Sequence, residues 1–328
     1  MYQRFYGLRV LPFELTSDPR MLVLTPRHRE ALGNLRYGLS TAKAVTVLIG
    51  EAGTGKTTLL RAALQSEDCR HVRCVYLHNP TLTRGEFFEV LSRELDLGSQ
   101  AAESKATLLM ELERGLRERR AAGEVVALVV DEAQSLGYEL LEEIRLLANI
   151  ETPTAKLLPL VLAGQPEFAA RLNDPALRQL KQRVALRCEI TALTLPETAE
   201  YIASRIRAAG GEGSRLFTRE AVMLVHEHAK GIPRTISVIC DNALVTGMAL
   251  GRQPVDSGMV LEVCRDFDLS AAQGTTVRPP VAGVVEREPT SIQTEQTATV
   301  VRQTSNQPEA ANARRRPTGL TLLGLSRS

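Results

Sequence analysis

Residues 50–57 have the sequence Gly-Glu-Ala-Gly-Thr-Gly-Lys-Thr, a complete G-x-x-x-x-G-K-[ST] phosphate-binding loop. An apolar, β-branched run over 44–49 precedes the loop, as expected of a buried parallel strand, and good helix formers follow it over 58–64. Glycines let successive N–H groups of such a loop face inward, and the helix N-terminus adds partial positive charge there. The sequence therefore predicts a site for the phosphates of a nucleoside triphosphate.

The whole phosphate loop is expected to contact the nucleotide. Lys56 would reach the β- and γ-phosphates, and the Thr57 hydroxyl would bind Mg²⁺. The residues expected to bind the nucleotide are Gly50, Glu51, Ala52, Gly53, Thr54, Gly55, Lys56, Thr57 and Thr58.

Two acids follow the apolar run over residues 124–130. Because the carboxyl ends of parallel strands meet at one edge of a sheet, Asp131 and Glu132 are expected beside the phosphate loop. Asp131 would hold Mg²⁺ through its water shell, and Glu132 would orient the attacking water as the general base. Acids favoured by the dipole of a helix start are the plainer alternative, but the loop upstream favours a catalytic site.

Strands and helices alternate through residues 1–195, the expected nucleotide-binding domain. Apolar runs predict strands over 44–49, 72–77, 124–130, 157–163 and 184–190. This order is typical of an α/β fold, a P-loop NTPase with a parallel five-stranded sheet and helices on both faces. Pro12 and Pro19 break regular structure, so the first twenty residues are expected to be extended or looped, within a linker over 1–25.

Only helical segments are predicted after residue 195, at about 196–209, 218–229, 233–250 and 256–266, so a small all-α lid domain is expected over 196–268. Residues 269–328 contain no aromatic residue and are rich in Pro, Thr, Gln, Ser and Arg. Such a segment buries too little apolar surface to offset its ordering entropy, and a disordered tail is expected. Its run Arg314-Arg315-Arg316 could dock on acidic lipid, nucleic acid or a partner, although three such charges usually serve only solubility.

Composition narrows the function classes. Lys and Arg number 40 against 38 Asp and Glu, a balance that does not demand a nucleic-acid partner. No apolar run is long enough for a membrane-spanning helix, and the start lacks the layout of a secretory signal. The five scattered cysteines fit reduced thiols in the cytoplasm. A cytoplasmic protein is expected, or one peripheral to the inner membrane.

Together these motifs resemble AAA+ ATPases of the general secretion pathway protein A (ExeA-like) type, which are related to TnsC- and TniB-like transposition ATPases. The resemblance covers about residues 1–267 and implies ATP as the nucleotide, its hydrolysis, and a helical lid. The matching segments are Tyr2-x-x-Phe5-Tyr6-Gly7-Leu8, Pro12-Phe13, Asp18-Pro19-Arg20, His28-x-Glu30-Ala31-Leu32, Tyr37-Gly38, Asp131-Glu132-Ala133-Gln134, 141–152, 162–167, 177–183 and Gly231-Ile232-Pro233-Arg234.

The family pattern implies further roles. Gln165, after the fourth strand, matches the sensor-1 region, where a polar side chain contacts the γ-phosphate or the water; a plain helix-start residue is the alternative. Asn79, after the second strand, sits where a polar residue can restrain the catalytic Glu132. Arg234 matches sensor 2, a lid arginine that approaches the γ-phosphate and ties the lid angle to the nucleotide state.

The resemblance also implies a homo-oligomer, a ring or a filament, with ATP between subunits. Arg183, before the fifth strand, resembles an arginine finger offered to a neighbouring subunit, with Arg178 as the alternative. The ATPase would drive assembly or energising of a secretion, pilus or exopolysaccharide-export machinery, with components of that envelope machinery as partners.

The other function considered is an ATP-dependent DNA-binding regulator of the transposition or initiator type. No recognition helix or aromatic–basic stripe supports DNA binding. Longer family members carry a membrane segment and a peptidoglycan-binding domain after the ATPase. Neither is visible in this sequence, so an envelope anchor is not expected.

Overall fold

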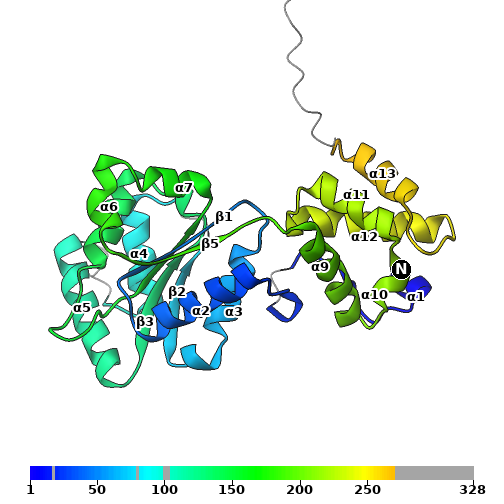
Figure 1. Cartoon of the computed structure of the whole chain (residues 1–328). Helices are drawn as coiled ribbons and strands as arrows, with labels where there is room; N and C mark the ends of the chain where they lie inside the picture. Colours follow the sequence, from blue (N-terminus) through cyan, green and yellow to red (C-terminus); the bar gives the residue numbers. More distant parts are fainter. Residues whose placement is uncertain (17–18, 79–80, 99–103, 270–328) are drawn as a thin grey trace, which may run out of the picture. The chain divides into compact units, whose positions relative to one another are not determined.

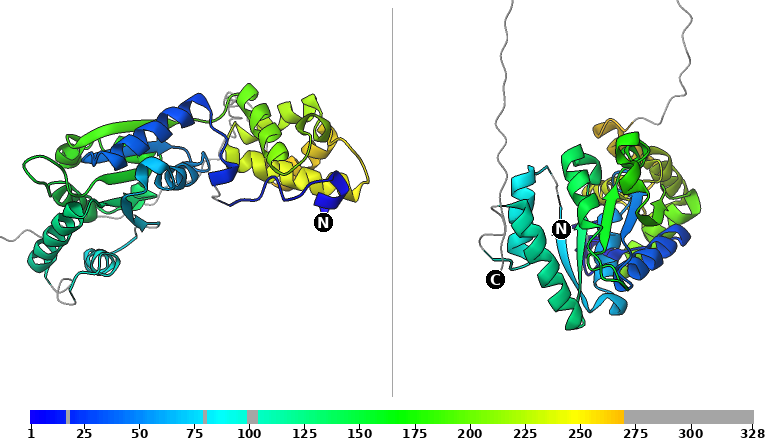
Figure 2. Two further views of the ribbon diagram at one scale, coloured as in Figure 1. Left: turned by 90° about the horizontal axis from the view of Figure 1, so that it is seen from below. Right: turned by 90° about the vertical axis from the view of Figure 1, so that its left-hand side faces the viewer.

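The computed structural model describes residues 1–16, 19–78, 81–98 and 104–269, which belong to one compact unit (Figures 1 and 2). The predicted tail beyond Leu269, with its run Arg314–Arg316, lies outside the described residues. The candidate residue Asn79 also lies outside them.

A parallel five-stranded sheet forms the centre of the nucleotide-binding region, as predicted. Every residue of β1, β3 and β4 is buried, because these strands are covered on both faces and consist almost entirely of apolar residues. The strand order is β2-β3-β4-β1-β5, and each neighbouring pair is parallel. The strands are β1 (Val45–Gly50), β2 (Val72–Leu77), β3 (Val125–Val130), β4 (Leu160–Gly164) and β5 (Val184–Ile190). This confirms the predicted fold class.

Helices cover both faces of the sheet (Figure 1). Successive residues of a strand point to opposite faces, so β3 supplies two apolar clusters. Val126, Leu128 and Val130 pack with helices α4 to α8, whereas Ala127 and Val129 pack with α2 and α3. These helices are α2 (Pro26–Ser40), α3 (Lys56–Leu64), α4 (Arg84–Glu94), α5 (Lys105–Ala121), α6 (Tyr138–Leu147), α7 (Pro166–Arg171) and α8 (Arg178–Lys181), joined in part by the short 3-10 turns η1 (Pro19–Met21), η2 (Glu67–Cys69), η3 (Ala133–Ser135) and η4 (Pro175–Leu177).

Between β5 and Leu269, the last described residue, every named element is a helix, as the sequence predicts. Thr194 and Glu197 form a capping box at the first of them, where each side chain bonds the other residue's main-chain N–H. The helices are α9 (Leu195–Ala208), α10 (Gly213–Leu216), α11 (Arg219–Ala229), α12 (Pro233–Ala249) and α13 (Ser257–Asp266), of which the short α10 is not among the predicted segments.

The first residues of the chain differ from the sequence prediction. An extended or looped segment is expected, but α1 (Tyr2–Tyr6) is a helix, ended by Gly7 in the left-handed conformation at φ 68°. Tyr2, Tyr6, Leu8 and Phe13 are buried in the same apolar cluster as helices α9 to α13. A helix of five residues is too short to show a periodic pattern, and this one is stabilised by its packing on the lid helices. The domain boundaries at 195 and 268 stay a prediction.

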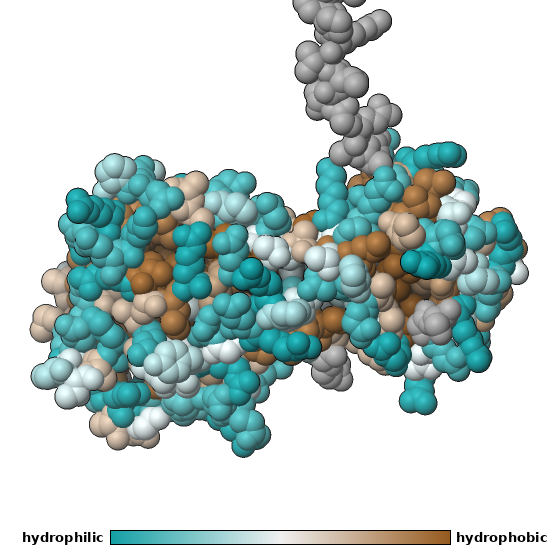
Figure 3. All heavy atoms as spheres, viewed as in Figure 1, coloured by the Kyte–Doolittle hydropathy of each residue, from teal (hydrophilic) through white to brown (hydrophobic). Residues whose placement is uncertain are grey.

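Polar side chains are spread over the face drawn in Figure 3, with apolar ones between them. Within the described parts of the chain, no helix combines the length and apolarity needed to cross a membrane.

Candidate active site

The phosphate loop connects β1 to α3 and is shaped by its glycines. Gly53 and Gly55 have φ values of 80° and 99°, a region that side chains rarely adopt. A Cβ on Gly50 would lie 2.6 Å from Cγ1 of Ile190, and one on Gly53 would lie 2.8 Å from Cβ of Arg234. The loop is therefore a cradle that only glycine permits at these positions, as a backbone site for phosphate oxygens requires.

Lys56 is the first residue of α3, and its ammonium group folds back onto the loop. Nζ donates to the carbonyl oxygens of Gly50 and Glu51, at 2.8 and 3.1 Å, and the side chain is only 4% exposed. Burial lowers the pKa of Lys56, while the nearby charges of Glu132 and Asp131 act in the opposite direction. Phosphate oxygens would be stronger acceptors for this ammonium than the two neutral carbonyls.

The two residues predicted to bind the metal lie in contact. Asp131, buried at the end of β3, accepts a hydrogen bond from the Thr57 hydroxyl at 2.6 Å. Its carboxylate also accepts from the Tyr76 hydroxyl at 3.1 Å and from the main-chain N–H of Glu132 at 3.0 Å. Tyr76, on β2, is not predicted to belong to the site, because in sequence it is one more residue of an apolar strand.

The Thr57 hydroxyl and the Asp131 carboxylate suit Mg²⁺ that is bound to a nucleotide better than a metal ion that only protein groups hold. The described parts of the chain contain no cluster of three or more His, Cys, Asp or Glu side chains that could hold a metal ion. Mg²⁺ binds proteins through one or two carboxylates and keeps waters or phosphate oxygens as its other ligands. The hydroxyl of Thr57 and the carboxylate of Asp131 fit that pattern.

Glu132 is held by two side-chain amides. Its backbone is left-handed, at φ 55°, and its Oε2 accepts from Nε2 of Gln134 and, at 3.3 Å, from Nε2 of Gln165. Gln134 in turn accepts, through Oε1, the main-chain N–H of Gln165 at 3.1 Å. The predicted residues Glu132 and Gln165 are thus brought together through Gln134, which is not among the predicted site residues.

Arg171 on α7 fixes the turn that carries Gln134. Its guanidinium donates to the carbonyl oxygens of Gln134 and Leu136, at 2.7 and 2.9 Å, and lies 5.0 Å from the centre of the Tyr138 ring. Because both bonds go to main-chain atoms, no local sequence pattern predicts them.

His28 supports the phosphate loop from α2. Its Nε2 lies 3.2 Å from the carbonyl oxygen of Thr54, and its Nδ1 lies 2.7 Å from the Thr25 hydroxyl. A carbonyl oxygen can only accept, so Nε2 carries the proton and Nδ1 accepts from the hydroxyl. Burial lowers the pKa of His28, partly offset by the bond to the Thr54 carbonyl. The sequence assigns no role to the family segment that begins at His28. The structure shows that its histidine supports the phosphate loop.

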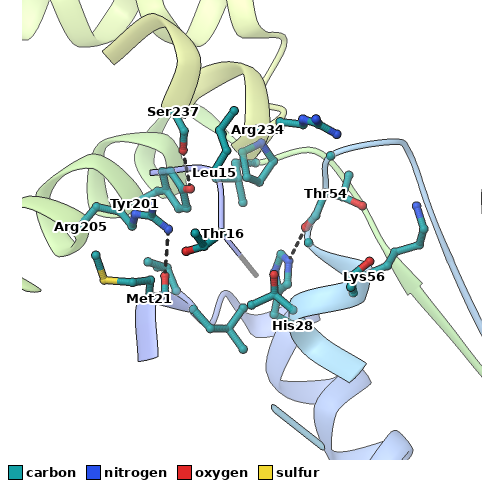
Figure 4. A pocket seen from close by; sticks show the side chains of 18 of the residues that line it. Leu15, Thr16, Met21, His28, Thr54, Lys56, Tyr201, Arg205, Arg234 and Ser237 are labelled. Carbon is teal, nitrogen blue, oxygen red and sulfur yellow. Dashed lines mark hydrogen bonds between the residues drawn. The ribbon is translucent and has the colours of Figure 1, made fainter. Parts of the chain in front are cut away.

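A cavity of about 260 Å³ joins the phosphate loop to the N-terminal segment and the lid helices. In Figure 4, Lys56, Thr54 and His28 lie at one side of it, and Met21, Tyr201 and Arg205 lie at the other. The lining residues are Glu14, Leu15, Thr16, Met21, Leu22, Val23, His28, 53–58, Glu132, Leu193, Tyr201, Arg205, Pro233, Arg234 and Ser237. The sequence does not predict this cavity, because its lining residues come from distant segments.

Arg234, the predicted sensor-2 residue, lies beside the phosphate loop. It is the second residue of α12, and its main-chain N–H donates to the carbonyl oxygen of Gly53 at 3.2 Å. Its side chain is exposed and lines the cavity.

Arg183 lies away from the phosphate loop of its own chain. Val184, the next residue, pairs with Val45 at the start of β1, whereas the loop follows the end of β1 at Gly50. The Nε of Arg183 is buried and has no hydrogen-bond partner among the described residues. Arg178 is exposed on α8.

Comparisons with known proteins agree with this geometry. Residues 40–172 match the family model described as AAA domain. Over 279 residues the chain is 37% identical to general secretion pathway protein A of Aeromonas hydrophila. The aligned region covers 85% of this chain and 49% of that protein. The chain thus spans about half the length of this relative.

Solved structures show the same fold at low sequence identity. Cdc6p from Pyrobaculum aerophilum has a TM-score of 0.62 and 19% identity, covering 78% of this chain and 70% of that one. The ORC2 protein of Aeropyrum pernix, in ADPNP–ADP complexes, has a TM-score of 0.60 and 16% identity, covering 78% and 71%. Residues 40–172 therefore form an AAA domain with the P-loop NTPase fold, and the chain is an AAA ATPase homologous to general secretion pathway protein A.

Proposed function

We propose that this chain binds ATP with Mg²⁺ and hydrolyses it between the subunits of a homo-oligomer, to drive assembly or energising of a secretion or export machinery. The observation that carries the proposal is the convergence of Lys56, the Thr57–Asp131 pair and Glu132 at one cavity. These groups come from two distant parts of the chain, the phosphate loop and the end of β3, and have the chemistry that phosphoryl transfer requires.

The binding groups lie at the phosphate end of the cavity. The glycine loop and the N-terminus of α3 offer N–H donors for phosphate oxygens, and the Lys56 ammonium adds a positive charge. The Thr57 hydroxyl and the Asp131 carboxylate would hold Mg²⁺. When bound, the metal neutralises phosphate charge and the nucleotide supplies the bond to be cleaved.

Glu132 would act as the general base. Both amides that hold it donate to Oε2, so among the described residues Oε1 is left to accept from a water molecule. A carboxylate held in this way can orient the water and take its proton. Gln165, bonded to the same carboxylate, would contact the terminal phosphate or the water.

Arg183 supports the oligomeric part of the proposal, and Arg234 supports a role for the lid. Arg183 is remote from its own phosphate loop, as a group that acts on a neighbour's nucleotide would be. An arginine that stabilises transition-state charge in this way is worth about three to five orders of magnitude in rate in other NTPases. Arg234, on the lid beside Gly53, would link the position of the lid to the nucleotide state.

The process served is inferred from homology. A relative 37% identical is a general secretion pathway protein, which supports a partner among the components of such a machinery. The five cysteines are free thiols, and with ATP as the substrate they support a cytoplasmic location, or one at the cytoplasmic face of the inner membrane.

ATP turnover by the full chain tests the proposed chemistry. Glu132→Gln should still bind ATP but hydrolyse it about two to four orders of magnitude more slowly, since the base is lost. Lys56→Ala should weaken binding itself. Hydrolysis by Glu132→Gln at the wild-type rate would show that another group is the base.

Fluorescence anisotropy with a labelled DNA duplex, with and without ATP, tests the assigned process. A DNA regulator would bind in an ATP-dependent manner, with affinity that falls linearly on a log–log plot against salt. No binding at low salt with ATP present supports the secretion role, and salt-dependent binding would replace it with the DNA-regulator function.

A further inference from the structure

A buried arginine of the lid is bonded to the N-terminal segment. Arg205, on α9, is only 6% exposed, and its guanidinium donates to three main-chain carbonyl oxygens. The distances are 2.6 Å from Nε to Pro12, 2.9 Å from NH2 to Glu14 and 3.5 Å from NH1 to Met21. The guanidinium also lies 5.7 Å from the centre of the Tyr201 ring.

The surroundings of Arg205 are unusual for a buried charge. Most buried cations are paired with an acid, because removing a charge from water is costly. Within the described residues, no carboxylate forms an ion pair with Arg205, and its positive charge is stabilised by carbonyl dipoles and an aromatic ring. An apolar side chain in this place would remove the donor from these carbonyl oxygens, so the arginine is what bonds the N-terminal segment to α9.

The carbonyls that Arg205 holds belong to one wall of the nucleotide cavity. We call residues 12–16 and 19–23 the strap. Six of its residues line the cavity, and four of these present apolar side chains: Leu15, Met21, Leu22 and Val23. Arg205 bonds Pro12 and Glu14 in the first part of the strap and Met21 in the second, so a single side chain holds both parts.

The opposite wall is tied to the same arginine. Tyr201, against which the guanidinium lies, shares a hydrogen bond of 2.8 Å with the Ser237 hydroxyl on α12, and both side chains line the cavity (Figure 4). Arg205 therefore lies where the strap, α9 and α12 meet, at the end of the cavity away from Lys56.

We propose that Arg205 is a positioning residue for nucleotide binding: it holds the strap against the lid, so that their apolar side chains enclose the base of the nucleotide. The proposal rests on the proposed function. Because its partners are main-chain carbonyls at the end of the cavity away from Lys56, Arg205 acts on the base end and not on the phosphate end.

The test compares a ligand that has a base with one that lacks it. Isothermal titration calorimetry on the full chain, with Mg²⁺, measures Kd for ATP and for inorganic tripolyphosphate. The variants are Arg205→Met, Arg205→Lys and the control Arg207→Met. Arg207 lies on the same helix but is exposed and bonds Glu200, so its loss leaves the strap untouched.

Arg205→Met should raise Kd for ATP by about tenfold or more, because affinity falls with the fraction of molecules whose pocket is formed. Its Kd for tripolyphosphate should change by less than about twofold, since the phosphate loop is unaffected. Arg205→Lys, which keeps the charge and some donors, should lie between Arg205→Met and the wild type. Arg207→Met should match the wild type with both ligands.

Two results would overturn the proposal. ATP affinity that is unchanged in both Arg205 variants would show that the strap does not need this arginine. An equal loss for ATP and tripolyphosphate would assign Arg205 to the general fold. If Arg205→Met does not fold, as judged by thermal unfolding, the ATP-to-tripolyphosphate ratio of Arg205→Lys decides. A wild-type chain that binds neither ligand would instead refute the proposed function, and this inference with it.

Discussion

Replacing Gln134 should slow ATP turnover without weakening ATP binding. Gln134 donates to the carboxylate of Glu132 and accepts the main-chain N–H of Gln165. A hydrogen bond to a charged group contributes about 1.5–3 kcal/mol. If that contribution is lost mainly in the transition state, kcat falls about ten- to hundredfold, since each 1.36 kcal/mol is a factor of ten.

Steady-state ATP hydrolysis of Gln134→Ala and Gln134→Glu measures this effect. Gln134→Glu keeps the size of the side chain but replaces the donor with an acceptor beside another carboxylate, so it should lose at least as much activity as Gln134→Ala. KM for ATP should stay within about twofold, because neither variant touches the phosphate loop. Gln65→Ala, an exposed glutamine at the end of α3, is the matched control. A kcat of wild-type size in both Gln134 variants would refute the reasoning that this amide holds the base.

Three further outcomes are expected. Gly53→Ala should weaken ATP binding measured by calorimetry, because its Cβ would lie 2.8 Å from a lid side chain and φ is 80°; unchanged affinity would contradict the need for glycine. The pKa of His28 is lowered by burial from 6.5, so its contribution to stability is complete above about pH 6.5 and is lost as the pH falls from there to the folded-state pKa. In urea unfolding, the free energy of unfolding of His28→Gln should therefore fall less over that pH range than that of the wild type. An equal dependence of the two free energies on pH would contradict this. Glu143 is buried and forms ion pairs with Arg84 and Lys105, at 3.0 and 2.8 Å, so Glu143→Gln should lower the free energy of unfolding by about 1–3 kcal/mol in urea titrations, and no loss would contradict that role.

The sequence predicts the parts of the site that lie in short motifs. The eight residues of a phosphate loop are enough to specify its conformation and its ligand. The carboxyl end of an apolar strand determines where Asp131 and Glu132 lie. The sheet is predictable for the same reason, because its strands are continuous apolar runs. Gln165 and Arg234 require the family resemblance as well, since a single polar residue carries no pattern.

Contacts between distant segments are not predictable in this way. Gln134 and Gln165 are 31 positions apart, and their bond depends on how β3 and β4 are placed. Arg205 bonds main-chain atoms 184 to 193 positions away, which leave no trace in the side-chain pattern. The prediction of an extended or looped segment is wrong for Tyr2–Tyr6, because tertiary packing, and not local propensity, stabilises the helix there.

Mixing two inactive variants tests most directly whether ATP is hydrolysed between subunits. Arg183→Ala and Lys56→Ala should each be nearly inactive alone, but a mixed interface can pair an intact phosphate loop with an intact arginine. In an equal, random mixture about one quarter of the head-to-tail interfaces have both, so about a quarter of the wild-type rate should return. No recovery, in mixtures where differently tagged subunits copurify, would contradict a trans role for Arg183 and leave Arg178 as the alternative.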